Sequence, residues 1–341
     1  MPAAPGYYQN PVLDADFPDP TIIRAPDGWY YAYGTQTKLF GGRVVNIQVA
    51  RSRDLVHWDY LGEALPEKPR WAAATQEFWA PHVSQHEGRY YLYYSAEPDY
   101  GAGLALAVAT AHAPTGPFVD IGRPLLHTGM SGFADIDPMA FDDPATGRRW
   151  LYWGSGFGPL RVRELAPDRV SFLPGSETVE LLPARPDDPT HYQRLIEGSW
   201  VILRQGWYYL FYSGNNCCGP DAHYGVLVAR SRAATGPFET LADATGGPGT
   251  ILEASADWRA PGHNCVVTDE AGQDWLAYHA INPARPTFNA IDADQGYSRR
   301  VMLLDRLEYP ADGWPRLVTG GTASRRPMPA PIGQASVPSA S

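Results

Sequence analysis

The chain has 341 residues and a formal net charge of −10, with 44% hydrophobic and 19% charged residues. This composition favours a large folded core over disorder. The negative charge argues against nucleic acid as a partner, because such binding needs clustered cations. No apolar run of about 18 residues is present, so no membrane span is predicted. Residues 1–11 lack the features of a signal peptide, so we expect a cytoplasmic protein, or a secreted or periplasmic one whose signal was removed.

Glycine, proline and cysteine narrow the choice further. The 34 Gly and 33 Pro residues leave little room for long helices. Three cysteines are too few for a disulfide scaffold and are not spaced as zinc ligands. The adjacent pair Cys217-Cys218 is either a vicinal disulfide, formed in an oxidising compartment, or two reduced thiols in a turn.

One sequence phrase occurs five times along the chain: a Gly, then aromatic residues at fixed offsets, then a small polar residue. The leading glycines are 60, 59, 59 and 66 residues apart. Turn residues at each Gly predict a hairpin, with a short strand before it and an aromatic-rich strand after it. A third strand and a fourth short segment follow. The five copies are residues 28–34, 88–95, 147–155, 206–213 and 272–279.

Four antiparallel strands, repeated radially, are typical of a propeller blade. The sequence therefore predicts an all-β protein, a five-bladed β-propeller formed as a single domain by residues 1–323. Residues 324–341 are rich in Pro, Ala and Ser without a period, and we expect them to form a loosely ordered tail. The alternative is a β-sandwich with aromatic residues clustered by chance, which the near-constant period disfavours.

The first strand of each blade lines the central channel, so residues at matching positions circle the axis together. Nine residues before the leading Gly stand Asp19, Trp79, Glu197 and His263, and ten before it in the third unit stands Asp137. A position used only for the core would be apolar each time. Three carboxyl groups in one crevice raise the proton affinity of at least one of them, which proteins retain mainly where the proton is used.

The residues around the three acids support a functional role for them, although each acid alone has an ordinary structural explanation. Asp19-Pro20 and Asp137-Pro138 hold each Asp extended at the start of a strand. Glu197 stands among apolar and aromatic residues, a setting that favours its protonated form. The shared offset is what favours a common site.

Motifs along essentially the whole chain resemble those of glycoside hydrolase family 43. One departure is Cys265, where Ser is more usual in the family. The segments that carry the resemblance are 10–12, 16–21, 78–83, 135–138, 197–200, 261–264, 300–305 and 313–315.

The resemblance implies an inverting glycosidase, in which Asp19 is the general base and Glu197 the general acid. Asp137 would orient the acid and tune its pKa. Inversion needs the two reacting carboxyl groups roughly 6.5–9.5 Å apart, with room for a water. His263 would lie beneath the sugar, where relatives often hold a calcium ion or water on the axis, and no organic cofactor is expected. The implied substrate-binding residues are Trp79, His82, His263 and Arg300.

Two further segments, 153–157 and the Cys-Cys loop at 213–220, resemble arabinan-acting members of the family. We therefore expect an α-L-arabinofuranosidase or arabinanase that acts, as a monomer, on a plant cell-wall oligo- or polysaccharide. Exo and endo action both stay open. The alternatives are a β-D-xylosidase of the same family, a retaining fructan-cleaving enzyme, or a non-catalytic sugar-binding propeller, which would not need three convergent acids.

Overall fold

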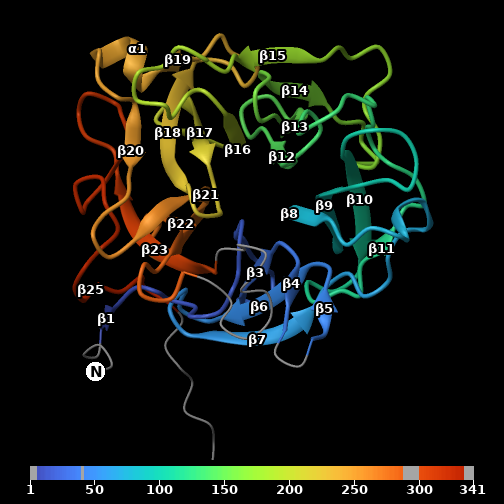
Figure 1. The fold of residues 1–341 in the computed structure, drawn as a ribbon, viewed down its shortest axis with the longest axis horizontal. Coiled ribbons are helices and arrows are strands. Elements are labelled where there is room, and N and C mark those ends of the chain that lie inside the picture. Colours follow the sequence, from blue (N-terminus) through green and yellow to red (C-terminus); the bar gives the residue numbers. More distant parts are fainter. Residues whose placement is uncertain (1–5, 40–41, 287–298, 334–341) are drawn as a thin grey trace, which may run out of the picture.

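Five antiparallel sheets of four main strands surround a central axis, as Figure 1 shows. The structure is a computed structural model that describes residues 6–39, 42–286 and 299–333. The predicted all-β five-bladed propeller is confirmed. Across these ranges, no helix is long and apolar enough to cross a bilayer.

Each blade contains four strands that follow one another in the chain, from the innermost to the outermost. The first three blades are β2 (Thr21–Arg24), β3 (Tyr30–Gly34), β6 (Gln48–Ser52) and β7 (Trp58–Glu63); β8 (Phe78–His86), β9 (Arg89–Ala96), β10 (Ala105–Ala111) and β11 (Val119–Asp120); β12 (Met139–Asp142), β13 (Arg149–Trp153), β14 (Leu160–Glu164) and β15 (Val179–Leu182). The last two are β16 (Ile196–Arg204), β17 (Trp207–Asn216), β18 (His223–Ser231) and β19 (Glu239–Thr240), with β20 (Thr250–Leu252) beside β18; and β21 (Arg259–Thr268), β22 (Asp274–Ile281), β23 (Arg300–Glu308) and β24 (Arg316–Leu317).

Few elements lie outside the blades. They are the paired strands β1 (Tyr7–Tyr8) and β25 (Met328–Pro329), the paired strands β4 (Thr37–Lys38) and β5 (Val44–Val45), the 3-10 helix η1 (Arg70–Ala72) and the short helix α1 (Leu241–Thr245).

The aromatic phrase of each repeat forms the second strand of a blade, where both faces of the sheet are covered by neighbouring blades. Its tyrosines pack in the core and still bond their hydroxyl groups, as buried tyrosines must. In the first three blades, one such hydroxyl donates to a backbone carbonyl in the loop between the third and fourth strands of the next blade. The pairs are Tyr33 to Pro114 at 2.6 Å, Tyr93 to Arg169 at 2.7 Å and Tyr152 to Ala234 at 2.6 Å.

Contacts between inner strands run around the whole ring, from β2 to β8, β12, β16, β21 and back to β2. The N-terminal segment closes the ring by crossing the fifth blade ahead of β2. Val12 N donates to Met302 O at 3.0 Å, and Phe17 N donates to Arg300 O at 2.7 Å. The start of the chain is therefore bonded to its last blade.

Both ends of the described chain meet at one buried carboxyl group, that of Asp305. Its oxygens accept hydrogen bonds from the hydroxyls of Tyr278 at 2.6 Å and Tyr8 at 3.2 Å. The side-chain amide of Asn10 and the backbone N–H of Ser324 also donate to it, both at 3.2 Å. Asp305 thus joins the N-terminal segment, the fifth blade and the C-terminal segment.

The C-terminal segment differs from the expected loose tail over residues 324–333. Ser324 is buried, β25 pairs with β1, and Ile332 N donates to Asp269 Oδ2 at 3.1 Å. These contacts depend on residues near the other end of the chain, which the composition of the segment does not reveal. Residues 334–341 lie outside the described part of the chain.

We expect Asp305→Ala to lower the free energy of unfolding by about 3 kcal/mol, because it leaves the buried Tyr278 hydroxyl without its acceptor and removes one of the acceptors of Tyr8 and of Asn10. Urea unfolding followed by tryptophan fluorescence would measure the change. Asp257→Ala, which breaks an exposed ion pair with Arg325, is the matched control and should cost less than about 1 kcal/mol. Equal losses in the two variants would contradict the role of Asp305.

Candidate active site

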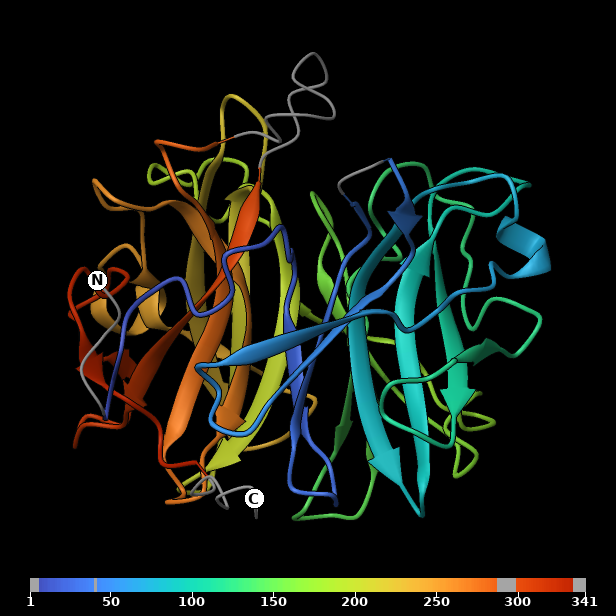
Figure 2. The ribbon, with the colours of Figure 1, turned by 90° about the horizontal axis from the view of Figure 1, so that it is seen from below.

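The direction of the strands brings the predicted acids to one end of the propeller. Asp19 and Asp137 stand just before their inner strands, and Glu197 stands at the start of β16. Antiparallel strands place the loops between second and third strands at this same end, together with the connections that lead into each inner strand. Figure 2 shows the blades from the side, with the strands running between the two ends.

One residue with a left-handed backbone occurs at the matching place in every blade. Its φ angle is 54° at Asp19, 46° at Ala80, 57° at Asp137, 66° at Gly198 and 47° at His263. Asp19 and Asp137 are therefore not extended, contrary to the prediction from the prolines that follow them. The strand pairing shifts register at these residues in β8, β16 and β21, as it does at a β-bulge. Such bulges re-aim side chains, and non-glycine residues with positive φ cluster at functional sites.

The backbone N–H of each left-handed residue is bonded to a side chain from the preceding blade. In four of the five interfaces, the acceptor is the polar residue at the end of the aromatic phrase of the repeat or directly after it. The four bonds run from Ala80 to Thr35 Oγ1 at 2.8 Å, from Asp137 to Ser95 Oγ at 3.0 Å, from His263 to Ser213 Oγ at 2.8 Å and from Asp19 to His279 Nδ1 at 3.1 Å.

Asp19 is buried and surrounded by polar groups. Thr35 Oγ1 donates to Asp19 Oδ2 at 2.5 Å, while Asp19 Oδ1 lies 3.2 Å from His279 Nδ1, 3.3 Å from His263 Nδ1 and 3.3 Å from Arg300 Nη1. Burial raises the pKa of this carboxyl, but Arg300, His263 and His279 together outweigh burial and hold the pKa well below its ordinary value. Asp19 is therefore ionised at neutral pH, as a general base must be.

Glu197 has the opposite protonation preference. It is partly buried, and its Oε1 accepts one hydrogen bond, from the Tyr224 hydroxyl on β18 at 2.7 Å. Burial raises the pKa of Glu197 to about 7; the Tyr224 hydrogen bond lowers it, and the charge of Asp19 raises it again. Burial is the largest cause of this shift, in agreement with the apolar and aromatic residues that flank Glu197 in the sequence.

Asp137 is buried and interacts with both other acids through charge. Its Oδ2 accepts a hydrogen bond from Gly198 N at 3.0 Å, beside Glu197 in the chain. Burial, then the charges of Glu197 and Asp19, raise the pKa of Asp137 well above its ordinary value. The Asp137–Glu197 pair therefore retains a proton at neutral pH, and Asp137 is bonded to the strand that carries the acid.

The structure brings five of the seven predicted site residues together: Asp19, Asp137, Glu197, His263 and Arg300. Trp79 is partly exposed at the rim, with its ring centroid 6.2 Å from that of Phe133.

His82 has different neighbours from those expected of a pocket wall. It is buried, its ring packs against Trp200 at 5.3 Å and Tyr93 at 6.3 Å, and burial lowers its pKa to about 4. A register shift between Trp79 and His82 changes which side chains of β8 turn toward the site. We assign His82 to the aromatic packing between blades.

Sequence reasoning did not find Tyr224, His279 or Thr35. His279 ends its aromatic phrase and Thr35 directly follows its own, so the repeat contained a signal for both. Tyr224 lies on a third strand, where no repeat marks it. A glycine on β21 of the next blade fits its position, since a Cβ on Gly262 would lie 2.1 Å from the Tyr224 ring. Glycine at position 262 leaves the space that Tyr224 occupies.

The open question on Cys217 and Cys218 has a structural answer, because the two form a disulfide. Arg300 Nη1 lies 3.8 Å from Cys217 Sγ. The Cys-Cys loop therefore borders the guanidinium that pairs with Asp19.

The axial calcium ion stays a prediction. Calcium takes six to eight oxygen ligands in proteins. In the part of the chain that the structure describes, no group of three or more His, Cys, Asp or Glu side chains is arranged to hold a metal. His263 Nδ1 faces the carboxyls of Asp19 and Asp137. These residues do not form a calcium cage by themselves, so we derive no catalytic step through an ion.

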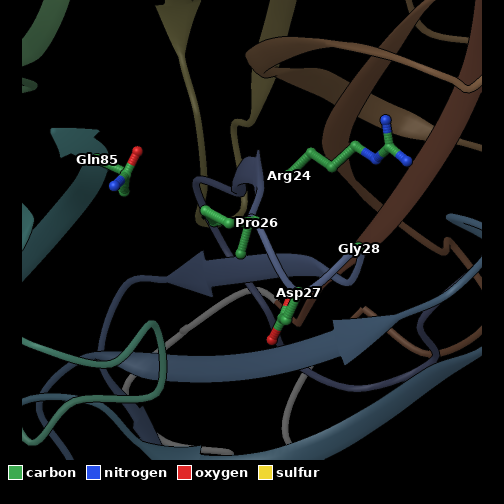
Figure 3. Close-up of a pocket in the computed structure, with 6 residues that line it drawn as sticks. Arg24, Pro26, Asp27, Gly28 and Gln85 are labelled. Carbon is green, nitrogen blue, oxygen red and sulfur yellow. The ribbon is translucent and has the colours of Figure 1, made fainter. Parts of the chain in front are cut away.

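A separate cavity of about 440 Å³ lies at the turn between β2 and β3, lined by Arg24 to Gly28 and Gln85 (Figure 3). Asp19 precedes β2 and this turn follows it, so the cavity lies at the end of the inner strand away from the acids. It is not part of the acid site.

One ionised and one protonated carboxyl group in the same site form the pair that glycoside hydrolysis uses. The family model of the glycosyl hydrolases family 43 matches residues 8–315. The chain therefore belongs to glycosyl hydrolase family 43.

Individual relatives agree with this assignment. The extracellular exo-α-(1→5)-L-arabinofuranosidase ArbA of Cellvibrio japonicus is 28% identical over 89% of this chain and 86% of its own length. The β-D-galactofuranosidase xynD of Aspergillus niger is 29% identical over 89% of this chain and 83% of its own. The solved structure of Cellvibrio cellulosa α-L-arabinanase complexed with arabinohexaose matches with a TM-score of 0.72, at 24% identity over 90% of this chain and 96% of that one. This last likeness establishes the fold alone.

We expect Tyr224→Phe to shift the alkaline limb of the pH profile of kcat/KM upward. The hydroxyl of Tyr224 lowers the pKa of Glu197, so its removal raises that pKa and keeps Glu197 protonated to higher pH. The wild-type limb should fall near pH 7 and the acidic limb below the ordinary range of an aspartate. Tyr33→Phe, which removes a hydroxyl bonded to Pro114 O in another blade, is the control and should leave both limbs in place. If the alkaline limb of Tyr224→Phe stays at the same pH or moves to lower pH, the assignment of Glu197 as the general acid is contradicted.

Proposed function

We propose that this protein is an inverting glycosidase that cleaves α-L-arabinofuranosidic linkages in arabinan, arabino-oligosaccharides or arabinose side chains of plant cell-wall polysaccharides. The observation that carries the proposal is the opposite protonation of two acids in one site. Arg300, His263 and His279 hold Asp19 ionised, whereas burial holds a proton on Glu197. A non-catalytic sugar-binding propeller has no use for this difference.

The chemistry follows from these two protonation states. Glu197 donates its proton to the glycosidic oxygen as the bond from that oxygen to the anomeric carbon breaks. Asp19 removes a proton from a water, whose oxygen forms the new bond to the anomeric carbon on the opposite face of the ring. The anomeric configuration is thereby inverted. The expected separation of the two carboxyl groups, roughly 6.5–9.5 Å, stays a prediction.

Asp137 and Arg300 would have supporting roles. Asp137 is bonded to Gly198 N, so it orients the strand that carries Glu197. The Arg300 guanidinium stabilises the charge of Asp19 and lies where it would donate to hydroxyl groups of a bound sugar.

The choice of arabinose rests on relatives and on one loop. The Cellvibrio japonicus relative is named an arabinofuranosidase and the Aspergillus niger relative a galactofuranosidase, and both names specify five-membered sugar rings. The Cys-Cys loop that resembles those of arabinan-acting proteins borders Arg300. We therefore favour an arabinofuranoside over a xylopyranoside, and we expect the protein to act as a monomer.

A digest of linear arabinan tests the substrate, with xylobiose as the comparison. Release of arabinose or arabino-oligomers is expected, and the ratio of the two products separates exo from endo action. Proton NMR of the first products should show inverted configuration at the anomeric carbon. Xylose release without action on arabinan would overturn the proposed substrate, and retained configuration would overturn the proposed mechanism.

Asp19→Ala and Glu197→Ala should separate the two catalytic roles. On arabinobiose, we expect each variant to lower kcat/KM by about 10²- to 10⁴-fold with the fold intact. On α-L-arabinofuranosyl fluoride, whose leaving group needs little protonation, Glu197→Ala should retain far more activity than Asp19→Ala. Circular dichroism would verify the fold of both variants. Equal losses on the fluoride would show that the two roles are wrongly assigned.

A further inference from the structure

Large aromatic side chains lie exposed at the end of the propeller that carries the acids. We name Trp79, Phe133 and Phe157 the aromatic ledge. Phe133 is 42% and Phe157 75% exposed, and Trp79 is partly exposed. Exposed apolar side chains gathered at one place on a soluble protein mark a binding surface. None of the three has a part in the acid–base chemistry described above.

The ledge adjoins the general acid through the backbone. Phe157 lies in the loop between β13 and β14, and this loop is bonded to the residue next to Glu197. Ser155 N donates to Ile196 O at 3.0 Å, and Ile196 N donates to Gly156 O at 2.8 Å. The position of Phe157 is therefore set by the start of the strand that carries Glu197.

The three aromatic residues also follow one another in space. The Phe133 side chain lies against Gly156, where an added Cβ would come within 3.1 Å of Phe133 Cβ. The rings of Phe133 and Trp79 lie 6.2 Å apart with an interplanar angle of 37°. Phe157 follows Gly156 in the chain, so the ledge runs from the segment that is bonded to Ile196 through Phe133 to Trp79 on the second blade.

The loop that carries Phe133 is fastened at its base. Thr128 donates to Asp135 Oδ2 from its backbone N–H at 2.8 Å and from its hydroxyl at 2.6 Å. Asp135 is buried. Two further apolar side chains are exposed nearby in the chain: Met130 in this loop, and Tyr100, whose ring centroid lies 5.7 Å from that of His127. A surface held in this way needs little ordering when a ligand binds.

We propose that the aromatic ledge binds the sugars on the leaving-group side of the cleaved bond. This proposal rests on the proposed function. The general acid gives its proton to the leaving oxygen, so the leaving sugar must lie on the Glu197 side of the site. The aromatic rings there would pack against the carbon–hydrogen faces of successive arabinofuranose units, a neutral ligand that needs no charged partner. Cleavage should therefore be faster on longer arabino-oligosaccharides than on substrates with a minimal leaving group.

The test compares Phe157→Ala and Phe133→Ala with the wild type on three substrates: α-L-arabinofuranosyl fluoride, arabinobiose and arabinohexaose. Phe157→Ala is the decisive variant, because the side chain of Phe157 is so exposed that its loss should have little effect on folding. We expect kcat/KM on arabinohexaose to fall about 3- to 10-fold in each variant, mainly through KM, the size of an aromatic contact. The fluoride has no leaving sugar, so its kcat/KM should stay unchanged. Val119→Ala is the control, since Val119 is 63% exposed on the outer strand β11 and should have no effect.

Three outcomes would overturn the proposed sugar binding by the aromatic ledge without affecting the proposed function. Equal losses on the fluoride and on arabinohexaose would show that the aromatic residues only support the loop beside Glu197. Unchanged kinetics on every substrate would show that no sugar touches them. A wild-type dimer at micromolar concentration that both Phe variants disrupt, with unchanged kinetics, would make a second copy of the chain the occupant. A wild type that cleaves no arabinoside would instead overturn the proposed function, and the ledge with it.

Discussion

A hydrogen bond between neighbouring blades places the reactive side chains at the axis. Each inner strand has a residue in a left-handed conformation shortly before its start or in its first half, and this conformation costs free energy on its own. A polar side chain from the preceding blade accepts the N–H of that residue and fixes it, as Thr35 does for Ala80 and Ser95 for Asp137. Residues about sixty positions apart in this repeat array thereby reach one centre, so the same bond that joins the blades also aims the acids.

Placing acids inside a protein is unfavourable unless their charge is compensated, and the two reacting acids differ in this respect. Asp19 has a guanidinium and two imidazoles beside it and keeps its charge. Glu197 has one hydroxyl partner, Tyr224, and keeps its proton. The division into base and acid therefore follows from which side chains surround each carboxyl group, and the outer parts of the blades serve to hold those neighbours in place.

Much of this was predictable because a propeller converts sequence offset into spatial position. Five copies of one phrase determined the blades, and counting back from each Gly found Asp19, Asp137, Glu197 and His263 together. Sequence reasoning fails for His82, which the family resemblance placed beside the sugar and which is buried against Trp200 instead. It also fails for Tyr224, on a third strand without a repeat signal, and for residues 324–333, whose order depends on contacts with β1 and the fifth blade.

In four interfaces, the polar residue at or just after the end of the aromatic phrase accepts the N–H of the left-handed residue in the next blade. The interface between the third and fourth blades, which carries Glu197, is different. By analogy with the other blades, Ser155 should accept the N–H of Gly198. Its hydroxyl is instead buried without a hydrogen-bond partner among the described residues, and Asp137 accepts the N–H at 3.0 Å. The task that a neutral hydroxyl performs in other blades falls here to a carboxyl group. Asp137 is thereby fixed next to Glu197, where its position and its charge act on the same residue. A structural bond of the repeat has become part of the control of the general acid.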